Sequence, residues 1–214
     1  VQIGDLRILP APPYRRHSDL SRLSSWFHYF LKAAWVVFRT NRRALLFIVA
    51  QPPYLPFIGY VRNLLLGQKY VVWVDDVYPD VLVRSSRLSP DGLVVKLWRW
   101  LNRRMYGRAS SVFTLGSVMA ETLSKYVPDS SNSRAAIEVI PTWVDSGTFK
   151  QEPKERNPFA IEHRQVDKLT VLYSGNIGMT HNLDTMVEGA RRLKGYDDVH
   201  FIVVGDGPKW GHLR

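Results

Sequence analysis

Residues 169–193 read LTVLYSGNIGMTHNLDTMVEGARRL, and this stretch predicts a strand, a glycine loop and a helix. The strand is rich in β-branched and aromatic residues and ends at Ser174–Gly178. The apolar residues that follow share one helix face: Leu183, Met186, Val187, Ala190 and Leu193. Asn182 or Thr180 can cap the helix, and Asp184 falls in its first turn, where the helix dipole favours an anion. Such an arrangement brings backbone N–H groups together where a phosphate can bind.

A second apolar strand, residues 201–204 (FIVV), leads into another glycine loop, Gly205–Pro208. Two consecutive parallel strands place their glycine loops at the same edge of a sheet, which is where ligands bind in doubly wound folds. A turn that only reverses the chain explains residues 174–184 equally well, because glycine turns are common in α/β proteins. The spacing of Gly205, Gly207 and Gly211, with Pro208 between them, does not fit a dinucleotide fingerprint.

Bulk composition limits the classes of function. The chain has 214 residues, is 45% hydrophobic and carries a formal net charge of +10, so we expect a folded protein with anionic partners. It has no cysteine, which excludes disulfides and thiolate sites. No apolar run reaches the roughly 18–20 residues of a membrane span. A nucleic-acid-binding protein is an alternative that rests on charge alone, and no nucleic-acid motif supports it.

Strands and helices alternate along the rest of the chain. We expect a short strand within residues 1–13, a helix over residues 20–38, a buried parallel strand over residues 44–50 and a helix over residues 54–66. Further strands are expected over residues 70–74, 111–115 and 137–140, and further helices from Ser89, with Pro90 in its first turn, to about residue 106 and from Ser117 to about residue 126. Residues 150–165 are polar, prolyl and aperiodic and are interpreted as a linker.

The pattern predicts an α/β protein with parallel sheets in two Rossmann-like domains, the second of them incomplete. We place the first domain at residues 1–148, the linker at residues 149–166 and the start of the second domain at residues 167–214.

Carboxylates follow the strand over residues 70–74: Asp75, Asp76 and Asp80. At the carboxyl end of a strand they can bind a metal ion or orient sugar hydroxyls. The plainer alternative is solvated loop acids, with Asp80 capping a following helix.

Two basic and aromatic segments predict an anion-binding or membrane-facing surface, formed by Arg15, Arg16, Arg42, Arg43, Arg99, Arg103 and Arg104. The apolar face of the helix over residues 20–38 has two interpretations. It packs on a sheet as core, which is the commoner case, or it lies in a membrane interface. The histidines show no metal-binding spacing.

Several segments, in order, resemble the retaining glycosyltransferases of family 4, which have the GT-B fold and build bacterial exopolysaccharides and O-antigens. The segments are VVWVDDVYPD (residues 71–80), RRMYGRASSVFTLGSVMAETL (103–123), VIPTWVD (139–145), LYSGNIGMTHNLDTMVEGARRL (172–193) and IVVGDGP (202–208). The resemblance covers nearly the whole chain.

The resemblance implies an acceptor-binding N-terminal domain and a C-terminal domain that binds a nucleotide-diphosphate sugar, without cofactor or metal. Asp76 would be an acceptor-side polar group. The donor phosphates would lie against Gly175, Asn176, Gly178, His181, Gly205, Asp206 and Gly207. The reaction would transfer a sugar to a lipid-linked or polysaccharide acceptor, in the cytoplasm at the inner face of the plasma membrane.

The chain departs from this family in its phosphate cations. An arginine and a lysine of the family are replaced by Asn176 and His181, and no two glutamates have the spacing of the family's donor-site pair. We therefore expect a fragment truncated at both ends, which by itself is inactive or depends on a partner chain that completes the donor site. The alternative to an enzyme is a non-catalytic fragment or subunit.

Overall fold

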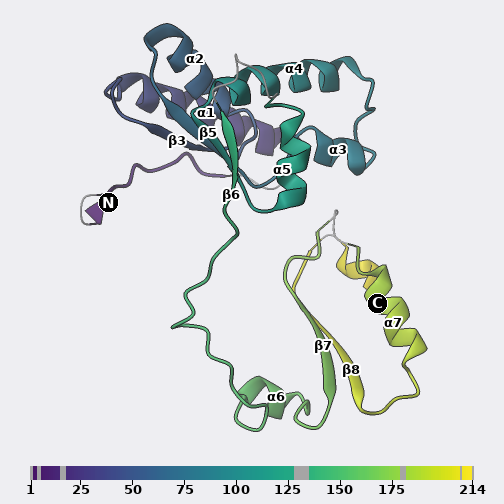
Figure 1. Ribbon diagram of the computed structural model, residues 1–214. Coiled ribbons are helices and arrows are strands. Elements are labelled where there is room, and N and C mark those ends of the chain that lie inside the picture. The colour runs from purple at the N-terminus through teal and green to yellow at the C-terminus, as the bar shows by residue number, and fades with distance from the viewer. Residues whose placement is uncertain are drawn as a thin grey trace. The chain divides into compact units, whose positions relative to one another are not determined.

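The structure is a computed structural model that describes residues 2–3, 6–14, 18–127, 135–178, 182–207 and 209–213. The chain divides into two compact units, Val1–Thr142 and Trp143–Arg214 (Figure 1). Both units are built from helices and parallel strands, so the predicted α/β class is confirmed.

The first unit contains a four-stranded parallel sheet in the order β3-β4-β5-β6. Its strands are β3 (Leu46–Val49), β4 (Tyr70–Val74), β5 (Ser111–Thr114) and β6 (Ala136–Val139). The strands lie in the sheet in the order in which they follow in sequence. Because parallel crossovers are right-handed, this order places all the connecting helices on one face of the sheet.

The helices of this unit begin and end largely where the sequence predicts. They are α1 (Asp19–Arg39), α2 (Pro56–Leu66), α3 (Asp80–Arg84), α4 (Leu93–Arg108) and α5 (Ser117–Ser124). Ser18 caps α1 through a capping box with Ser21. The expected start of α4 at Ser89 is wrong. The Gly92 N–H donates to the Ser89 carbonyl at 3.1 Å, so Pro90 lies in a turn that precedes the helix.

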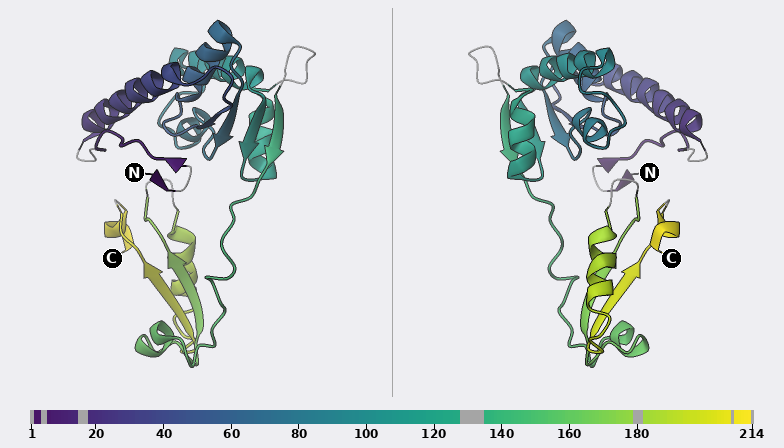
Figure 2. Two further views of the ribbon diagram at one scale, coloured as in Figure 1. Left: turned by 90° about the vertical axis from the view of Figure 1, so that its left-hand side faces the viewer. Right: turned by 90° about the vertical axis from the view of Figure 1, so that its right-hand side faces the viewer.

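The hydrophobic core lies between the sheet and its helices. Its buried residues come from alternate strand positions, such as Tyr70, Val72 and Val112, and from α4 and α5, such as Tyr106 and Leu123. Figure 2 shows the helices of this unit beside its sheet. Side chains on this face of the sheet are therefore shielded from water by the helices.

The opposite face of the sheet is accessible in the described part of the chain. Phe47 stacks with Phe113 at a ring-centroid distance of 6.3 Å and is 59% exposed, with Trp73 beside both rings. The expectation that residues 44–50 form a buried strand is therefore correct for only one face of β3. All the crossovers run over that face, and the face that carries Phe47 is left exposed.

The amphipathic helix α1 presents a similar correction. Its apolar stripe does not pack as core, since Leu20 is 81% and Leu31 49% exposed. The residues that α1 turns inward are on another side of the helix, including the buried Ser25 and Val37, which packs against the core. None of the described helices has the length and apolarity to cross a membrane. A short antiparallel pair, β1 (Gln2–Ile3) and β2 (Leu6–Arg7), precedes α1.

The second unit contains α6 (Pro158–Glu162), β7 (Leu169–Ser174), α7 (Asp184–Arg192), β8 (Val199–Val204) and the 3-10 helix η1 (Trp210–Leu213). Strands β7 and β8 are parallel and pair along their full length. The strand, loop and helix predicted for residues 169–193 are present.

The segment interpreted as a linker is attached to this unit. Helix α6 lies within it, and the Asn157 side chain accepts hydrogen bonds from the first N–H groups of the helix. Buried Gln165 accepts from the Thr170 hydroxyl at 3.0 Å, so the segment is fastened to β7. The division between the units follows Thr142, earlier than the expected end of the first domain at residue 148.

Candidate active site

Two loops at the carboxyl edge of the first unit's sheet form a pocket together with α1 and the segment before that helix. They follow β3 and β4, and each contains a cis proline, at Gln51–Pro52 and Tyr78–Pro79. The pocket has a volume of about 430 Å³. Its lining combines aromatic rings with polar groups: Ala11, Pro12, Tyr14, Ser25, Trp26, Tyr29, Gln51, Pro52, Pro53, Asp76 and Tyr78.

The carboxylates after β4 have different surroundings. Asp75 accepts hydrogen bonds from the Trp73 indole at 2.6 Å and from Gln51 at 3.2 Å. Asp76 is exposed and lines the pocket. Asp80 lies in the first turn of α3 and forms an ion pair with Arg99 at 3.0 Å. The carboxylates are thus not gathered around one point, and within the described ranges no group of acidic or histidine side chains could hold a metal ion.

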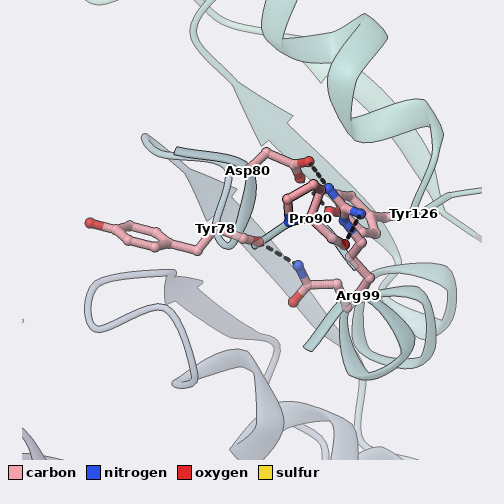
Figure 3. A network of polar contacts seen from close by, with 6 residues as sticks. Tyr78, Asp80, Pro90, Arg99 and Tyr126 are labelled. Atoms are coloured by element: carbon pink, nitrogen blue, oxygen red, sulfur yellow. Dashed lines mark hydrogen bonds and ion pairs between the residues drawn. The ribbon is translucent and has the colours of Figure 1, made fainter. Parts of the chain in front are cut away.

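A polar network holds the loop after β4 in place (Figure 3). Tyr126 is buried and its hydroxyl donates to Asp80, which also accepts from Arg99. Burial and the neighbouring Asp80 carboxylate raise the pKa of Tyr126 to about 12. Burial alone would lower the pKa of Arg99, but its bonds to Asp80 and Tyr126 outweigh this effect and raise that pKa. These side chains connect α3, α4 and the end of α5.

Asn102 fixes the backbone of the same loop. Its amide donates to the Tyr78 carbonyl at 2.6 Å, although the residue is fully buried in α4. The Tyr78 ring stacks on Trp98, one helical turn earlier in α4, with ring centroids 5.9 Å apart. Burial, followed by the Asp76 carboxylate, raises the pKa of the Tyr78 hydroxyl. The loop that carries Asp76 is therefore fastened to α4 at two points.

The arginines of the predicted basic surface do not all face solvent. Arg42, Arg43, Arg103 and Arg104 are exposed, and Arg104 lies over the Trp100 ring at 5.4 Å. Arg99 instead turns toward Asp80, because that carboxylate is the acidic partner beside it. Arg15 and Arg16 lie outside the described residues.

In the second unit the two glycine loops lie directly against each other. The Gly175 N–H donates to the Val204 carbonyl and the Ile177 N–H donates to the Asp206 carbonyl, both at 2.9 Å. A Cβ atom on Gly205 would lie 1.9 Å from the Gly175 carbonyl oxygen, so only glycine permits this approach. Ile177 is buried beneath the loops. The loop after β7 thus continues the pairing of the strands.

The predicted donor-site residues come together at this edge, as far as the structure describes them. Gly175, Asn176 and Gly178 are on the loop after β7, and Gly205, Asp206 and Gly207 follow β8. The Asp206 carboxylate accepts from the Gly207 N–H at 2.7 Å. His181 lies outside the described residues.

The predicted cap of α7 is displaced by one residue, because the N-cap position is Leu183, which makes no side-chain capping bond. The Asn182 side chain accepts from the Asp184 N–H at 2.9 Å, and Asp184 is the acidic residue of the first turn. The proposed cap at Thr180 lies outside the described residues.

The sequence does not identify three residues that position the loop after β4: Tyr78, Asn102 and Tyr126. The sequence contains one indication of such a role, at Asn102. Asn102 is polar but falls between Trp98, Leu101 and Met105 on the inward face of α4, where an unpaired amide would be costly. Its partner, a backbone carbonyl, has no signature in the sequence.

The sequence of the chain is similar to that of a known protein. No protein-family model matches the chain. The chain is similar to a protein of Pseudomonas aeruginosa described as the probable glycosyltransferase WbjE, with 24% identity over 197 residues. The alignment covers 92% of this chain and 48% of that protein, so the chain spans about half the length of this relative. The part of this chain that lies outside the alignment is shorter than either unit. Residues of both units are therefore aligned with that protein.

Proposed function

We propose that the chain is part of a glycosyltransferase that moves a sugar, with retention of configuration, from a nucleotide-diphosphate sugar to a lipid-linked or polysaccharide acceptor. The observation that carries sugar transfer is the similarity to a probable glycosyltransferase over 92% of the chain. Retention, the donor and a role in cell-surface polysaccharide synthesis rest on the motif resemblance.

The donor phosphates are proposed to bind at the paired glycine loops of the second unit. Gly175 lacks a side chain, so a ligand can approach the backbone there, whereas the missing side chains of Gly205 and Gly207 make room for the carbonyl groups of Gly175 and Ile177. The amino end of α7 adds the positive end of a helix dipole. Groups of this kind stabilise the charge that develops on a departing nucleotide. Asn176, and His181 when protonated, would take the places of the family's cations.

The acceptor is proposed to bind in the pocket of the first unit, where Asp76 is the polar group that meets its hydroxyl. This role agrees with the position of Asp76 at the carboxyl edge of the sheet and with its exposure. The aromatic rings around it can pack against the faces of a sugar. Asp75 holds the loop instead, through Trp73 and Gln51.

The proposed location is the cytoplasmic face of the plasma membrane, with an anionic lipid surface as partner. The exposed Arg42, Arg43, Arg103 and Arg104 support it, together with the exposed apolar stripe of α1.

Calorimetry with UDP- and GDP-sugars tests the proposal on the complete polypeptide. We expect one of these donors to bind and its affinity to fall when the exposed Asn176 is replaced by Ala. If none of them binds, the proposal is wrong. The same titration on residues 1–214 tests the alternative of a non-catalytic fragment or subunit. Donor binding by the complete polypeptide but not by residues 1–214 would favour a fragment that needs further chain.

A further inference from the structure

The pocket formed with the loops after β3 and β4, the Asp76 pocket, has a single charged side chain in its lining, among the residues that the structure describes. This is the Asp76 carboxylate, and no lysine, arginine or histidine joins it there. The volume of about 430 Å³ lies within the range of sites that bind small molecules. The pocket therefore presents negative charge, although the chain as a whole carries a net charge of +10.

The Asp76 carboxylate is available to a ligand, whereas its neighbours are not. Asp75 accepts from the Trp73 indole at 2.6 Å, and Asp80 pairs with Arg99 at 3.0 Å. In the described part of the chain no side chain donates a hydrogen bond to Asp76 or forms an ion pair with it. A carboxylate only accepts hydrogen bonds, so the partner that suits it best is a positively charged donor.

Aromatic rings line the same pocket, contributed by Tyr14, Trp26, Tyr29 and Tyr78. Trp98 covers one face of the Tyr78 ring, with ring planes 10° from parallel, and does not itself line the pocket. The pocket therefore meets Tyr78 on a side that Trp98 leaves open. The face of an aromatic ring carries negative potential and attracts a cation. Several rings around one site are the arrangement by which proteins recognise quaternary ammonium ligands.

Two other polar side chains of the lining are turned toward the protein itself. The Ser25 hydroxyl donates to the Ser21 carbonyl at 2.8 Å, and the Gln51 amide donates to Asp75 at 3.2 Å. An anionic ligand would need such donors. The lining thus suits a ligand that donates more than one that accepts.

Two arginines lie near the pocket without lining it. Arg22 donates to the Tyr14 hydroxyl at 3.3 Å, and both Arg22 and Arg87 act on Tyr78 through their charge. Burial is the largest cause that raises the pKa of the Tyr78 hydroxyl, and the Asp76 carboxylate raises this pKa further. The arginines lower it, each by less than Asp76 raises it. Asp76 is therefore the strongest single charge at this ring.

We propose that the Asp76 pocket binds a ligand that carries an ammonium group, with the carboxylate as its counter-ion and the aromatic rings beside it. An ammonium group needs no donor from the protein, and the two carboxylate oxygens can accept from it and from a neighbouring hydroxyl at once. That this ligand is the sugar acceptor rests on the proposed function, and the acceptor is then an amino sugar with a free amine. Binding of an ammonium ligand does not depend on that function.

Calorimetry on residues 1–214 at low ionic strength and about pH 6 tests the inference with two pairs of ligands. Choline is compared with the neutral alcohol in which a carbon atom replaces its nitrogen, and glucosamine, protonated at this pH, is compared with glucose. We expect each cation to bind saturably to one site and more tightly than its neutral counterpart by at least about fivefold. This difference should shrink as salt is added, because Asp76 is exposed.

Substitutions locate the site. Asp76→Asn should weaken binding of both cations by about fivefold or more and leave the neutral ligands unaffected. Tyr29→Leu, at a position 37% exposed, should weaken choline binding by about twofold or more. The matched controls are Asp91→Asn and Tyr196→Leu, both at exposed positions outside the pocket, and they should bind as the unaltered chain does.

The inference is overturned if neither cation binds, if each cation binds no better than its neutral counterpart, or if Asp76→Asn and Asp91→Asn have equal affinities. Binding of choline but not of glucosamine would keep the ammonium site and reject an amino sugar as its ligand. Equal transfer by the complete polypeptide to amino sugars and to their N-acetylated forms would reject the cationic acceptor but keep glycosyl transfer. Absence of any nucleotide-sugar binding would reject the proposed function and leave ammonium binding unaffected.

Discussion

Tyr78 and Trp98 lie face to face, with ring centroids 5.9 Å apart and ring planes only 10° from parallel. Tyr78 comes from the loop after β4 and Trp98 from α4, so the stack joins the candidate acceptor site to the helix layer. Aromatic pairs in such an offset arrangement contribute beyond the area that they bury.

A double-mutant cycle measures this contact. We expect Tyr78→Ala and Trp98→Ala to be coupled by about 0.5–1.5 kcal/mol of unfolding free energy in urea titrations. A parallel cycle on Tyr78→Ala and Trp143→Ala provides the control, because Trp143 belongs to the other unit. Additive effects of the first pair would show that the two rings do not stabilise each other.

Because of Tyr126, the stability of the first unit should fall as the pH rises in the alkaline range. Its folded-state pKa of about 12 lies above the ordinary value of 10.0. The folded state therefore holds the hydroxyl proton more tightly than the unfolded state. The stabilisation is complete below pH 10 and is lost as the pH rises toward 12, so unfolding free energy should fall in that window.

Tyr126→Phe identifies the source of this pH dependence. The variant should be less stable at pH 7 by about 1–2 kcal/mol, because Asp80 loses a partly buried hydrogen bond, and its stability should fall less between pH 10 and 12. Tyr196→Phe, at an exposed position, should leave both the stability and its pH dependence unchanged. Identical alkaline profiles for Tyr126→Phe and the unaltered chain would contradict the assignment.

Gly205→Ala should destabilise the second unit by about 2–4 kcal/mol, since the new Cβ atom would collide with the Gly175 carbonyl oxygen. Hydrogen exchange of the β7 and β8 amides reports this locally. Gly195→Ala is the control, because a Cβ atom there meets nothing within 4 Å, and it should be neutral or stabilising by up to about 1 kcal/mol. Unchanged protection of β7 and β8 in Gly205→Ala would refute the close contact of the loops.

Arg62 is a buried cation that connects α2 to its surroundings. It donates to Gln68 and to the Thr40 carbonyl, both at 2.8 Å. Arg62→Met keeps much of the apolar stem but leaves those acceptors unpaired, so we expect a loss of about 2–4 kcal/mol in urea unfolding. Arg43→Met, at an exposed position, should change stability by less than about 0.5 kcal/mol. Equal stability of the two variants would show that the Arg62 bonds are not needed.

Asp76→Asn should lower sugar transfer by the complete polypeptide by about tenfold or more without changing its unfolding free energy. The side chain is exposed and lines the pocket, so the substitution leaves the core unchanged and removes the charge that the proposed function places beside the acceptor. Asp91→Asn, an exposed carboxylate outside the pocket, is the control and should leave transfer unaffected. Full activity of Asp76→Asn would remove this residue from the reaction.

Much of the fold could be predicted because its signals are local. The glycine loop between β7 and α7, the start of α1 near Ser18 and the end of α2 at Gly67 each depend on neighbours within a few residues. The turn at Ser89–Gly92 is also local, but its sequence is ambiguous. Ser-Pro-Asp suits both a helix start and a turn, and the Gly92 N–H decides between them by bonding to Ser89.

The sequence predicts where the candidate sites lie, but it does not predict which side chains contact one another there. The sequence places Asp75, Asp76 and Asp80 after one strand, yet it does not show that Trp73 holds the first and Arg99 the third. Those partners come from the loop's own fold and from a helix further along the chain. Their distance and direction depend on how the loop turns at Pro79 and how α4 packs.

By itself the sequence determined the order of strands and helices and the positions of both glycine loops, because these follow from residue type and short-range spacing. Only the tertiary structure decided which apolar faces are covered. The order β3-β4-β5-β6 sends every crossover over one face of the sheet and leaves Phe47 exposed on the other. The packing of α1 likewise places Ser25 inward and Leu31 outward. An amphipathic pattern states that a face is apolar, but what covers that face depends on segments distant in the chain.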